Sequence, residues 1–275
     1  DERISAYMLL PEKIIGTIPA VLCVHQTVNM GKNQVIGLDP TPTGRDMAYA
    51  EHLVQQGFTT FAYDILPAGQ RVYPGVEPFD TGPFYEKYPQ WSIVGKEIFD
   101  VSQALNVLEA MPEVDQDRLS SIGHSKGGGI TIHAMAFDQR IRAGVSSCGA
   151  WPNRMSKNPW RSARGSWWVG LPRMRPFCLT GKKFPVQLYE LLALAAPRAL
   201  MNITALNDNK YSLEEAPLTG AAYLNMTENV KAIYRLYDRE EYFENITHLN
   251  GHGFIEEQRT PAYDFLKRHL SLNQE

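Results

Sequence analysis

Hydrophobic positions along the 275-residue chain follow two alternating patterns. Short apolar runs rich in β-branched and aromatic residues predict strands at residues 3–9, 18–24, 58–64, 119–123, 143–150, 198–206 and 230–237. Between them, apolar residues recur at helical spacing, most clearly at Val94, Ile98, Val101, Leu105 and Leu108. Strands that alternate with helices predict an α/β fold with a mostly parallel sheet covered on both faces. We expect one domain over residues 1–275.

Further helices are predicted at residues 45–56, 126–136 and 187–195, and in a segment that ends near Asn229. Thr260 and Pro261 are expected to open the last helix, because proline suits the first helical position. After the strand at 143–150, an insertion of about residues 151–185 interrupts the alternation. Insertions at this end of such a sheet lie over the active-site face, where loops carry specificity.

The segment SIGHSKGGGI, residues 121–130, surrounds Ser125 with four glycines. It lies between a predicted strand and a predicted helix. One interpretation is that the glycines only allow the strand and the helix to pack closely. The other is a nucleophile elbow, a tight turn that exposes the serine side chain for reaction.

A serine nucleophile needs a histidine to accept its proton and a carboxylate to orient that histidine. Asp208 follows the strand at 198–206, and His252 lies between two glycines ahead of the final helix. This gives the order Ser, Asp, His that accompanies such an elbow. His248 is the alternative base. Glu214 and Glu215 are alternative acids, although they also suit the start of a helix.

An oxyanion hole requires two backbone N–H groups that face the developing negative charge. The N–H of Lys126, directly after the serine, is expected to supply one. Gln26 or Thr27, in the loop after the strand at 18–24, is expected to supply the other. The remaining histidines near these segments are interpreted as structural residues: His25, His124 and His133.

Five segments together resemble one known superfamily: PAVLCVHQT, FTTFAYD, GHSKGG, NDN and GHGF. They are similar to α/β-hydrolases, and more narrowly to bacterial acetyl xylan esterases and dienelactone-hydrolase-like esterases, from about Pro19 to Leu270. The resemblance implies Ser125 as nucleophile, His252 as base and Asp208 as orienting acid, with no metal or organic cofactor.

The chain also departs from this family in three places. Many members have His-Gly where this chain has His25-Gln26, which bears on the second oxyanion donor. Dienelactone hydrolases proper use a cysteine where this chain has Ser125, so that activity is not expected. A lysine after the nucleophile is less usual than leucine or methionine, but only its backbone N–H is needed.

Net charge, apolar content and cysteine count limit the kinds of binding partner that we expect for this protein. The net charge of −3 does not favour nucleic acid, and no apolar run approaches the ~20 residues that span a bilayer. The three cysteines suggest neither a disulfide framework nor a zinc site. The first residues lack a signal-peptide pattern, which is compatible with a cytoplasmic protein or with an exported one whose signal was removed.

The insertion has a local excess of positive charge. Between Gln139 and Tyr189 there are ten lysines or arginines and no acidic residue. Arginine and tryptophan side chains suit sugar rings that bear carboxylates. The candidate substrate-binding residues are Trp160, Arg161, Arg164, Trp167 and Trp168. Alternatively, these arginines pin the long loop to surface carboxylates while the tryptophans form its core.

The sequence therefore predicts a serine carboxylic ester hydrolase that forms an acyl-enzyme, with a small or oligosaccharide ester from plant polysaccharide as substrate. One alternative is a peptidase of the prolyl oligopeptidase type. The other is a non-catalytic binding protein on a hydrolase scaffold, which would be expected to lack a member of the triad.

Overall fold

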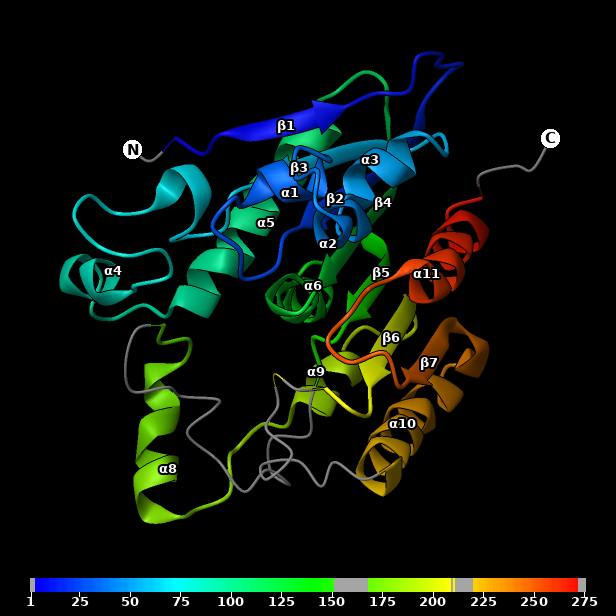
Figure 1. Cartoon of the computed structure of the whole chain (residues 1–275). Helices are drawn as coiled ribbons and strands as arrows, with labels where there is room; N and C mark the ends of the chain where they lie inside the picture. Colours follow the sequence, from blue (N-terminus) through cyan, green and yellow to red (C-terminus); the bar gives the residue numbers. More distant parts are fainter. Residues whose placement is uncertain (1–2, 151–167, 209, 211–219, 272–275) are drawn as a thin grey trace.

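The computed structural model describes residues 3–150, 168–208, 210 and 220–271. Their strands form one twisted sheet in the order β1-β3-β2-β4-β5-β6-β7 (Figure 1). Only β1 is antiparallel to its neighbour; each of the other pairs is parallel. The strands are β1 (Ala6–Leu9), β2 (Ile18–Val24), β3 (Thr59–Tyr63), β4 (Val114–His124), β5 (Ile141–Ser147), β6 (Ala199–Ala205) and β7 (Phe243–His248).

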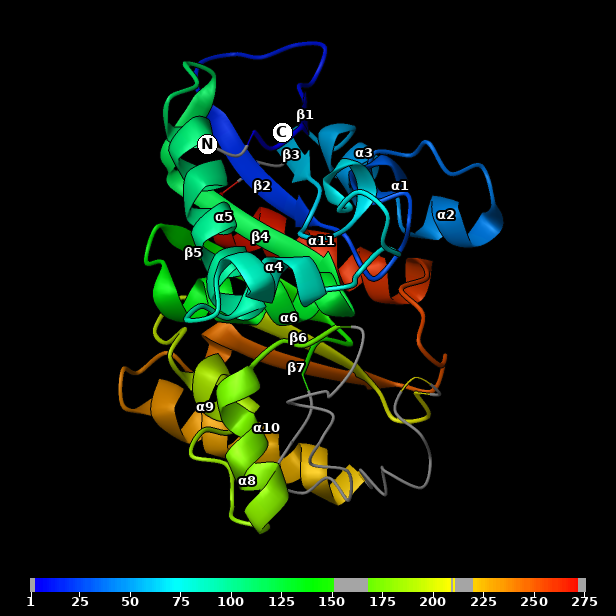
Figure 2. The same ribbon diagram turned by 90° about the vertical axis from the view of Figure 1, so that its left-hand side faces the viewer.

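Helices cover both faces of this sheet (Figures 1 and 2). One buried apolar cluster joins the sheet to α5 (Ile93–Glu109), α6 (Lys126–Phe137), α9 (Leu188–Ala193) and α10 (Gly220–Arg235). A second cluster joins the opposite face to α1 (Lys32–Val35), α3 (Tyr49–Val54) and α11 (Glu256–His269). These two layers confirm the predicted α/β fold with a mostly parallel sheet.

Shorter helices lie in the connections. They are α2 (Pro42–Asp46), α4 (Gly82–Lys87) and α8 (Arg175–Thr180), together with the 3₁₀ turns η1 (Gly69–Arg71), η3 (Pro172–Met174) and η4 (Glu240–Tyr242). α4 and η1 lie in a segment that the sequence analysis assigned to no strand or helix. Among the described residues, no helix is both long and apolar enough to cross a bilayer.

The predicted strand at 230–237 is wrong, because this segment continues α10 as a helix to Arg235. The buried residues Tyr223, Met226, Val230 and Tyr234 recur at intervals of three and four, which is the helical period. The apolar residues between them, such as Leu224 and Ile233, are exposed instead. The last strand is β7, at residues 243–248.

Two predicted helices also have different bounds. The helix expected at 45–56 is two short helices, because α2 begins at Pro42, where Thr41 caps it through the Gly44 N–H, and ends at Asp46. α11 begins at Glu256, so Pro261 lies inside it and not at its first position. Acidic residues in the first turn of α11 favour the earlier start, since they interact well with the helix dipole.

Candidate active site

Ser125 lies in the single-residue turn between β4 and α6. Its backbone angles are φ 53° and ψ −115°, a region that non-glycine residues rarely adopt. Its N–H donates a 2.7 Å hydrogen bond to the carbonyl oxygen of Ser147 in β5, which holds the turn against the sheet. Strained backbone of this kind clusters at functional sites, and the turn has the form of a nucleophile elbow.

The glycines around Ser125 allow very close packing of the backbone. A Cβ atom on Gly127 would lie 2.0 Å from the carbonyl oxygen of Val24 in β2. On Gly123 it would lie 2.3 Å from the carbonyl carbon of Gly127. The two interpretations of this motif are therefore compatible, since the close packing of β2, β4 and α6 is what shapes the sharp turn at Ser125.

Gly127→Ala is expected to destabilise the fold by about 3 kcal/mol, because the added methyl group overlaps backbone that cannot move aside. Gly129→Ala is the matched control two residues further along the same helix. Its Cβ would meet only the Gly149 carbonyl oxygen, at an ordinary 3.7 Å. Urea unfolding of both variants measures the difference, and equal midpoints would contradict this account of the motif.

Ser125, His252 and Asp208 meet at the carboxyl edge of the sheet. The Oγ of Ser125 is 2.8 Å from Nε2 of His252, and Nδ1 of His252 is 2.6 Å from Oδ2 of Asp208. The second carboxylate oxygen of Asp208 accepts the N–H of Lys210 at 2.9 Å. The three residues that the sequence singled out are thus in hydrogen-bond contact, in the arrangement by which a histidine activates a hydroxyl.

The alternative base does not take part in this chain of contacts. His248 is the last residue of β7, and its Nδ1 accepts the N–H of Asn250 at 3.2 Å within its own turn. The alternative acids, Glu214 and Glu215, lie outside the described residues. His252 is therefore the histidine that the structure brings to Ser125.

Asn207 is a positioning residue that the sequence analysis did not identify. Its side chain joins the loop after β6 to the loop after β7: Oδ1 accepts the Gly251 N–H at 2.9 Å, and Nδ2 donates to the Leu249 carbonyl at 2.7 Å. These bonds flank the contact between Asp208 and His252. Asn207 belongs to the NDN segment that the sequence drew attention to. Its bridging role becomes visible only once β6 and β7 are paired and their following loops lie side by side.

His124 packs directly against the ring of His252, with the ring centroids 4.8 Å apart. It stacks on Phe254 on its other side, and its Nδ1 hydrogen-bonds to the Ser147 hydroxyl at 2.9 Å. Burial holds the pKa of His124 well below its usual value, and the neighbouring His252 lowers it further. A neutral ring at this position does not oppose the protonation of His252.

Comparisons with known proteins agree with this geometry. A family model described as Acetyl xylan esterase (AXE1) matches residues 92–149, which include Ser125. The Bacillus subtilis protein "Putative hydrolase YtaP" is 24% identical over 274 residues, which cover 98% of this chain and 84% of that protein. A glucuronoyl esterase from Solibacter usitatus superposes with a TM-score of 0.71 at 18% identity, over 97% of this chain and 77% of that one.

The chain has the α/β-hydrolase fold. A second solved structure with the same fold is a carbohydrate esterase family 15 glucuronoyl esterase from Caldicellulosiruptor kristjansonii, with a TM-score of 0.65 and 18% identity. It covers 98% of this chain and 73% of that chain. The fold and the resemblance predicted from the sequence are thus confirmed, and the similarity is to the acetyl xylan esterase and glucuronoyl esterase kind.

The candidate oxyanion loop of this chain is anchored by His25. Its Nδ1 lies 2.6 Å from the Gln26 carbonyl, and its Nε2 accepts the Ile65 N–H at 3.0 Å, which confirms the expected structural role. The Gln26 side chain donates to Gln34 at 2.9 Å, away from the serine. Thr27 lines the same pocket as Ser125. The side-chain contact of Gln26 does not involve its backbone N–H, so both Gln26 and Thr27 stay candidates for the second donor.

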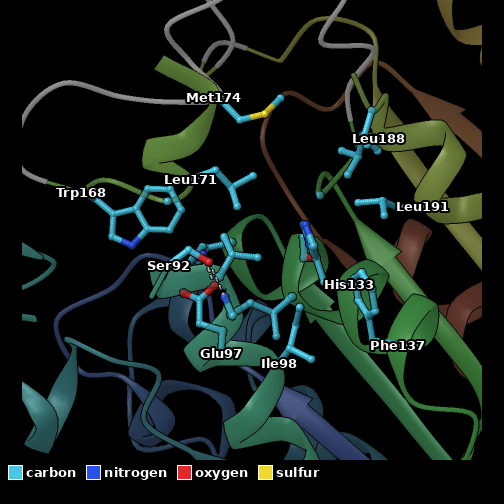
Figure 3. Close-up of a pocket in the computed structure, with 18 of the residues that line it drawn as sticks. Ser92, Glu97, Ile98, His133, Phe137, Trp168, Leu171, Met174, Leu188 and Leu191 are labelled. Carbon is cyan, nitrogen blue, oxygen red and sulfur yellow. Dashed lines mark hydrogen bonds and ion pairs between the residues drawn. The ribbon is translucent and has the colours of Figure 1, made fainter. Parts of the chain in front are cut away.

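A pocket of about 520 Å³ opens beside Ser125 (Figure 3). Its walls come from α5, α6, α9 and the insertion. The described part of the insertion contributes Trp168, Leu171 and Met174 to the lining, among others. Trp168 is therefore the one predicted substrate-binding residue that the structure places at the pocket. Trp160, Arg161, Arg164 and Trp167 lie outside the described residues.

Two of the ten basic residues, Arg140 and Arg142, lie before and within β5, outside the insertion, and pair with carboxylates there. Arg140 is paired with Asp138 and Glu109, both at 2.6 Å, and Arg142 lies 3.5 Å from Asp117. These arginines fix local structure beside β5. They do not contribute to the lining of the pocket.

Lys126, Glu97 and Trp168 form a charged cluster in the wall of this pocket. The Lys126 ammonium lies 2.7 Å from Glu97 Oε2 and 3.9 Å from the centre of a Trp168 ring. Burial raises the pKa of Glu97, while the adjacent Lys126 acts in the opposite direction. Sequence analysis assigned Lys126 only a backbone role and missed Glu97, which is an unremarkable helical residue until α5 packs against α6.

Among the described residues, Cys148, Asp208 and His252 have ligand atoms within 4.8 Å of one another. Burial raises the pKa of the Cys148 thiol to about 12. Asp208 and His252 already bind each other. These three residues therefore fit a hydrogen-bonded pair of acid and base, with Cys148 beside it, better than they fit a metal site.

Proposed function

We propose that this α/β-hydrolase is a serine carboxylic ester hydrolase with Ser125 as nucleophile. The observation that carries the proposal is the unbroken chain of contacts from Ser125 Oγ through His252 to Asp208. A non-catalytic protein on this scaffold has no need of such contacts at a strained turn. The pocket next to the serine offers room for one half of an ester.

In the proposed reaction, Ser125 Oγ attacks the ester carbonyl while His252 Nε2 takes the hydroxyl proton. Asp208 holds the proton on Nδ1 and stabilises the imidazolium that forms. The N–H groups of Lys126 and of Thr27 or Gln26 bind the oxyanion. Collapse of the tetrahedral intermediate expels the alcohol, which receives the proton from His252. Water then attacks the acyl-enzyme by the same route and releases the acid.

We further propose that the ester is one of a carbohydrate. The support is the similarity of fold to glucuronoyl esterases and the match of residues 92–149 to acetyl xylan esterases. A protein named Carbohydrate esterase MZ0003 is also 24% identical over 155 residues, although these cover only 54% of this chain and 34% of that protein. An acetyl, methyl or uronate ester of plant polysaccharide is the proposed substrate class.

Covalent labelling tests the reaction type. A fluorophosphonate, which traps activated serines, is expected to add one group to the protein, and peptide mapping should place it on Ser125. Prior incubation with a slowly hydrolysed ester should reduce the labelling. Modification at another serine, or none, would contradict the proposed nucleophile.

A side-by-side assay tests the substrate class. Acetylated xylose oligomers, methyl esters of uronates and a prolyl peptide are compared at equal concentration. We expect hydrolysis of at least one carbohydrate ester to exceed peptide cleavage by more than a hundredfold. Preferred cleavage of the peptide would favour the prolyl oligopeptidase alternative.

A further inference from the structure

The pocket follows one face of α6. Ser125, Gly129, His133 and Phe137 are spaced four residues apart, so they lie one above another, and all four line the pocket. A helical rise of 1.5 Å per residue places the backbone of His133 about 12 Å along the axis from Ser125. Gly129 has no side chain to fill the space between them. The pocket is therefore long enough for an extended group attached at the serine.

Away from Ser125, the walls of this pocket are largely apolar. Figure 3 shows Leu188 and Leu191 of α9 on one side of the pocket and Leu171 of the insertion on the other. Met174 of the insertion lies at the top of this view and Ile98 of α5 at the bottom. A sugar ring in this region would place several hydroxyl groups against hydrocarbon, and each hydroxyl without a partner costs free energy. These walls therefore suit a less polar group better than a sugar ring.

His133 brings a hydrogen-bond acceptor into these apolar walls. Its Nδ1 is 2.7 Å from the Gly129 carbonyl oxygen. A carbonyl oxygen only accepts, so Nδ1 carries the proton and Nε2 keeps a lone pair. Burial lowers the pKa of His133 to about 4, so the ring is neutral at pH 7. Figure 3 shows the ring projecting from α6 into the pocket.

We propose that the pocket takes a hydroxyaryl group of the ester, with its hydroxyl donating to Nε2 of His133. This inference rests on the proposed ester hydrolase and adds the identity of one half of its substrate. A flat ring fits between Phe137, Trp168 and the leucines of α9, and a rigid linker reaches from the serine to His133. The hydroxyaryl group belongs either to the acid or to the alcohol.

Two matched pairs of esters separate these possibilities. Methyl 4-hydroxycinnamate is compared with methyl cinnamate for the acid side, and 4-hydroxyphenethyl acetate with phenethyl acetate for the alcohol side. In one pair we expect kcat/KM to be about tenfold higher for the hydroxylated ester, since its analogue would cover Nε2 of His133 without offering it a hydrogen bond. In His133→Phe, which keeps a ring but removes the acceptor, this ratio should fall to about one.

His52→Phe is the matched control, because His52 lies on α3 and packs against Tyr263, away from the pocket. It should keep the wild-type ratio. A ratio of rates does not depend on how much protein is folded, so partial instability of either variant leaves the test valid. Equal rates for both members of each pair in the wild type, or an unchanged ratio in His133→Phe, would overturn the inference.

The result also separates this inference from the function on which it rests. If wild-type protein hydrolyses p-nitrophenyl acetate through Ser125 but does not discriminate between the paired esters, only the role of His133 fails. If fluorophosphonate does not label Ser125 and no ester is cleaved, the hydrolase proposal fails first.

Discussion

Ser125→Ala is expected to reduce turnover of p-nitrophenyl acetate by a factor on the order of 10⁶. The variant keeps the backbone of the elbow but loses the hydroxyl oxygen that lies 2.8 Å from His252 Nε2. No acyl-enzyme can then form, so the burst of nitrophenol before steady state should disappear as well. Stopped-flow measurement of the burst and of the steady rate gives both quantities.

Ser121→Ala provides the control for loss of a buried hydroxyl in the same strand. Ser121 lies four residues earlier in β4 and hydrogen-bonds to Thr131 at 3.0 Å, remote from the triad contacts. Its removal should cost about 1 kcal/mol of stability and leave turnover close to wild type. Near-normal hydrolysis by Ser125→Ala would remove the basis of the proposed mechanism.

Asp208→Asn is expected to lower kcat by about 10⁴ while KM changes little. The carboxylate at 2.6 Å requires the proton on Nδ1 of His252, which leaves Nε2 free to accept from Ser125. An amide NH₂ group in its place donates to Nδ1, and the histidine then carries its proton on Nε2. That tautomer cannot act as the base, although the geometry is preserved.

Glu257→Gln is the matched carboxylate-to-amide control. Glu257 lies in the first turn of α11 and accepts a 2.9 Å hydrogen bond from the Asn250 side chain, in the same loop region as His252. It should keep wild-type kcat, because it does not contact the base. A similar loss in both variants would mean that loop structure, rather than the tautomer of His252, determines the rate.

The site was predictable to the extent that it depends on topology. The carboxyl ends of parallel strands share one edge, so a residue just after each of β4, β6 and β7 could be placed near the others from order alone. That rule brought Ser125, Asp208 and His252 together. The rule places His252 correctly even though the strand predicted at 230–237 is wrong, because His252 still follows the last strand.

Side-chain contacts between helices, strands and loops could not be predicted from this rule on strand ends. Asn207 and Glu97 acquire their roles only when neighbouring loops or helices pack, and no sequence pattern marks the partner. His133 was interpreted as structural because it lies on the helix that follows the elbow. In the structure its Nδ1 bonds to Gly129 within that helix, whereas its other nitrogen faces a pocket assembled from several segments. Likewise, the excess of basic residues between Gln139 and Tyr189 did not indicate which arginines form ion pairs with carboxylates.

The bridge made by Asn207 restricts how the two loops of the candidate site can move. Since one amide ties the loop that carries Asp208 to the loop that carries His252, neither loop can swing outward alone without breaking two hydrogen bonds. A complex with an inhibitor in the pocket should therefore keep the contact between His252 and Asp208 at its resting 2.6 Å.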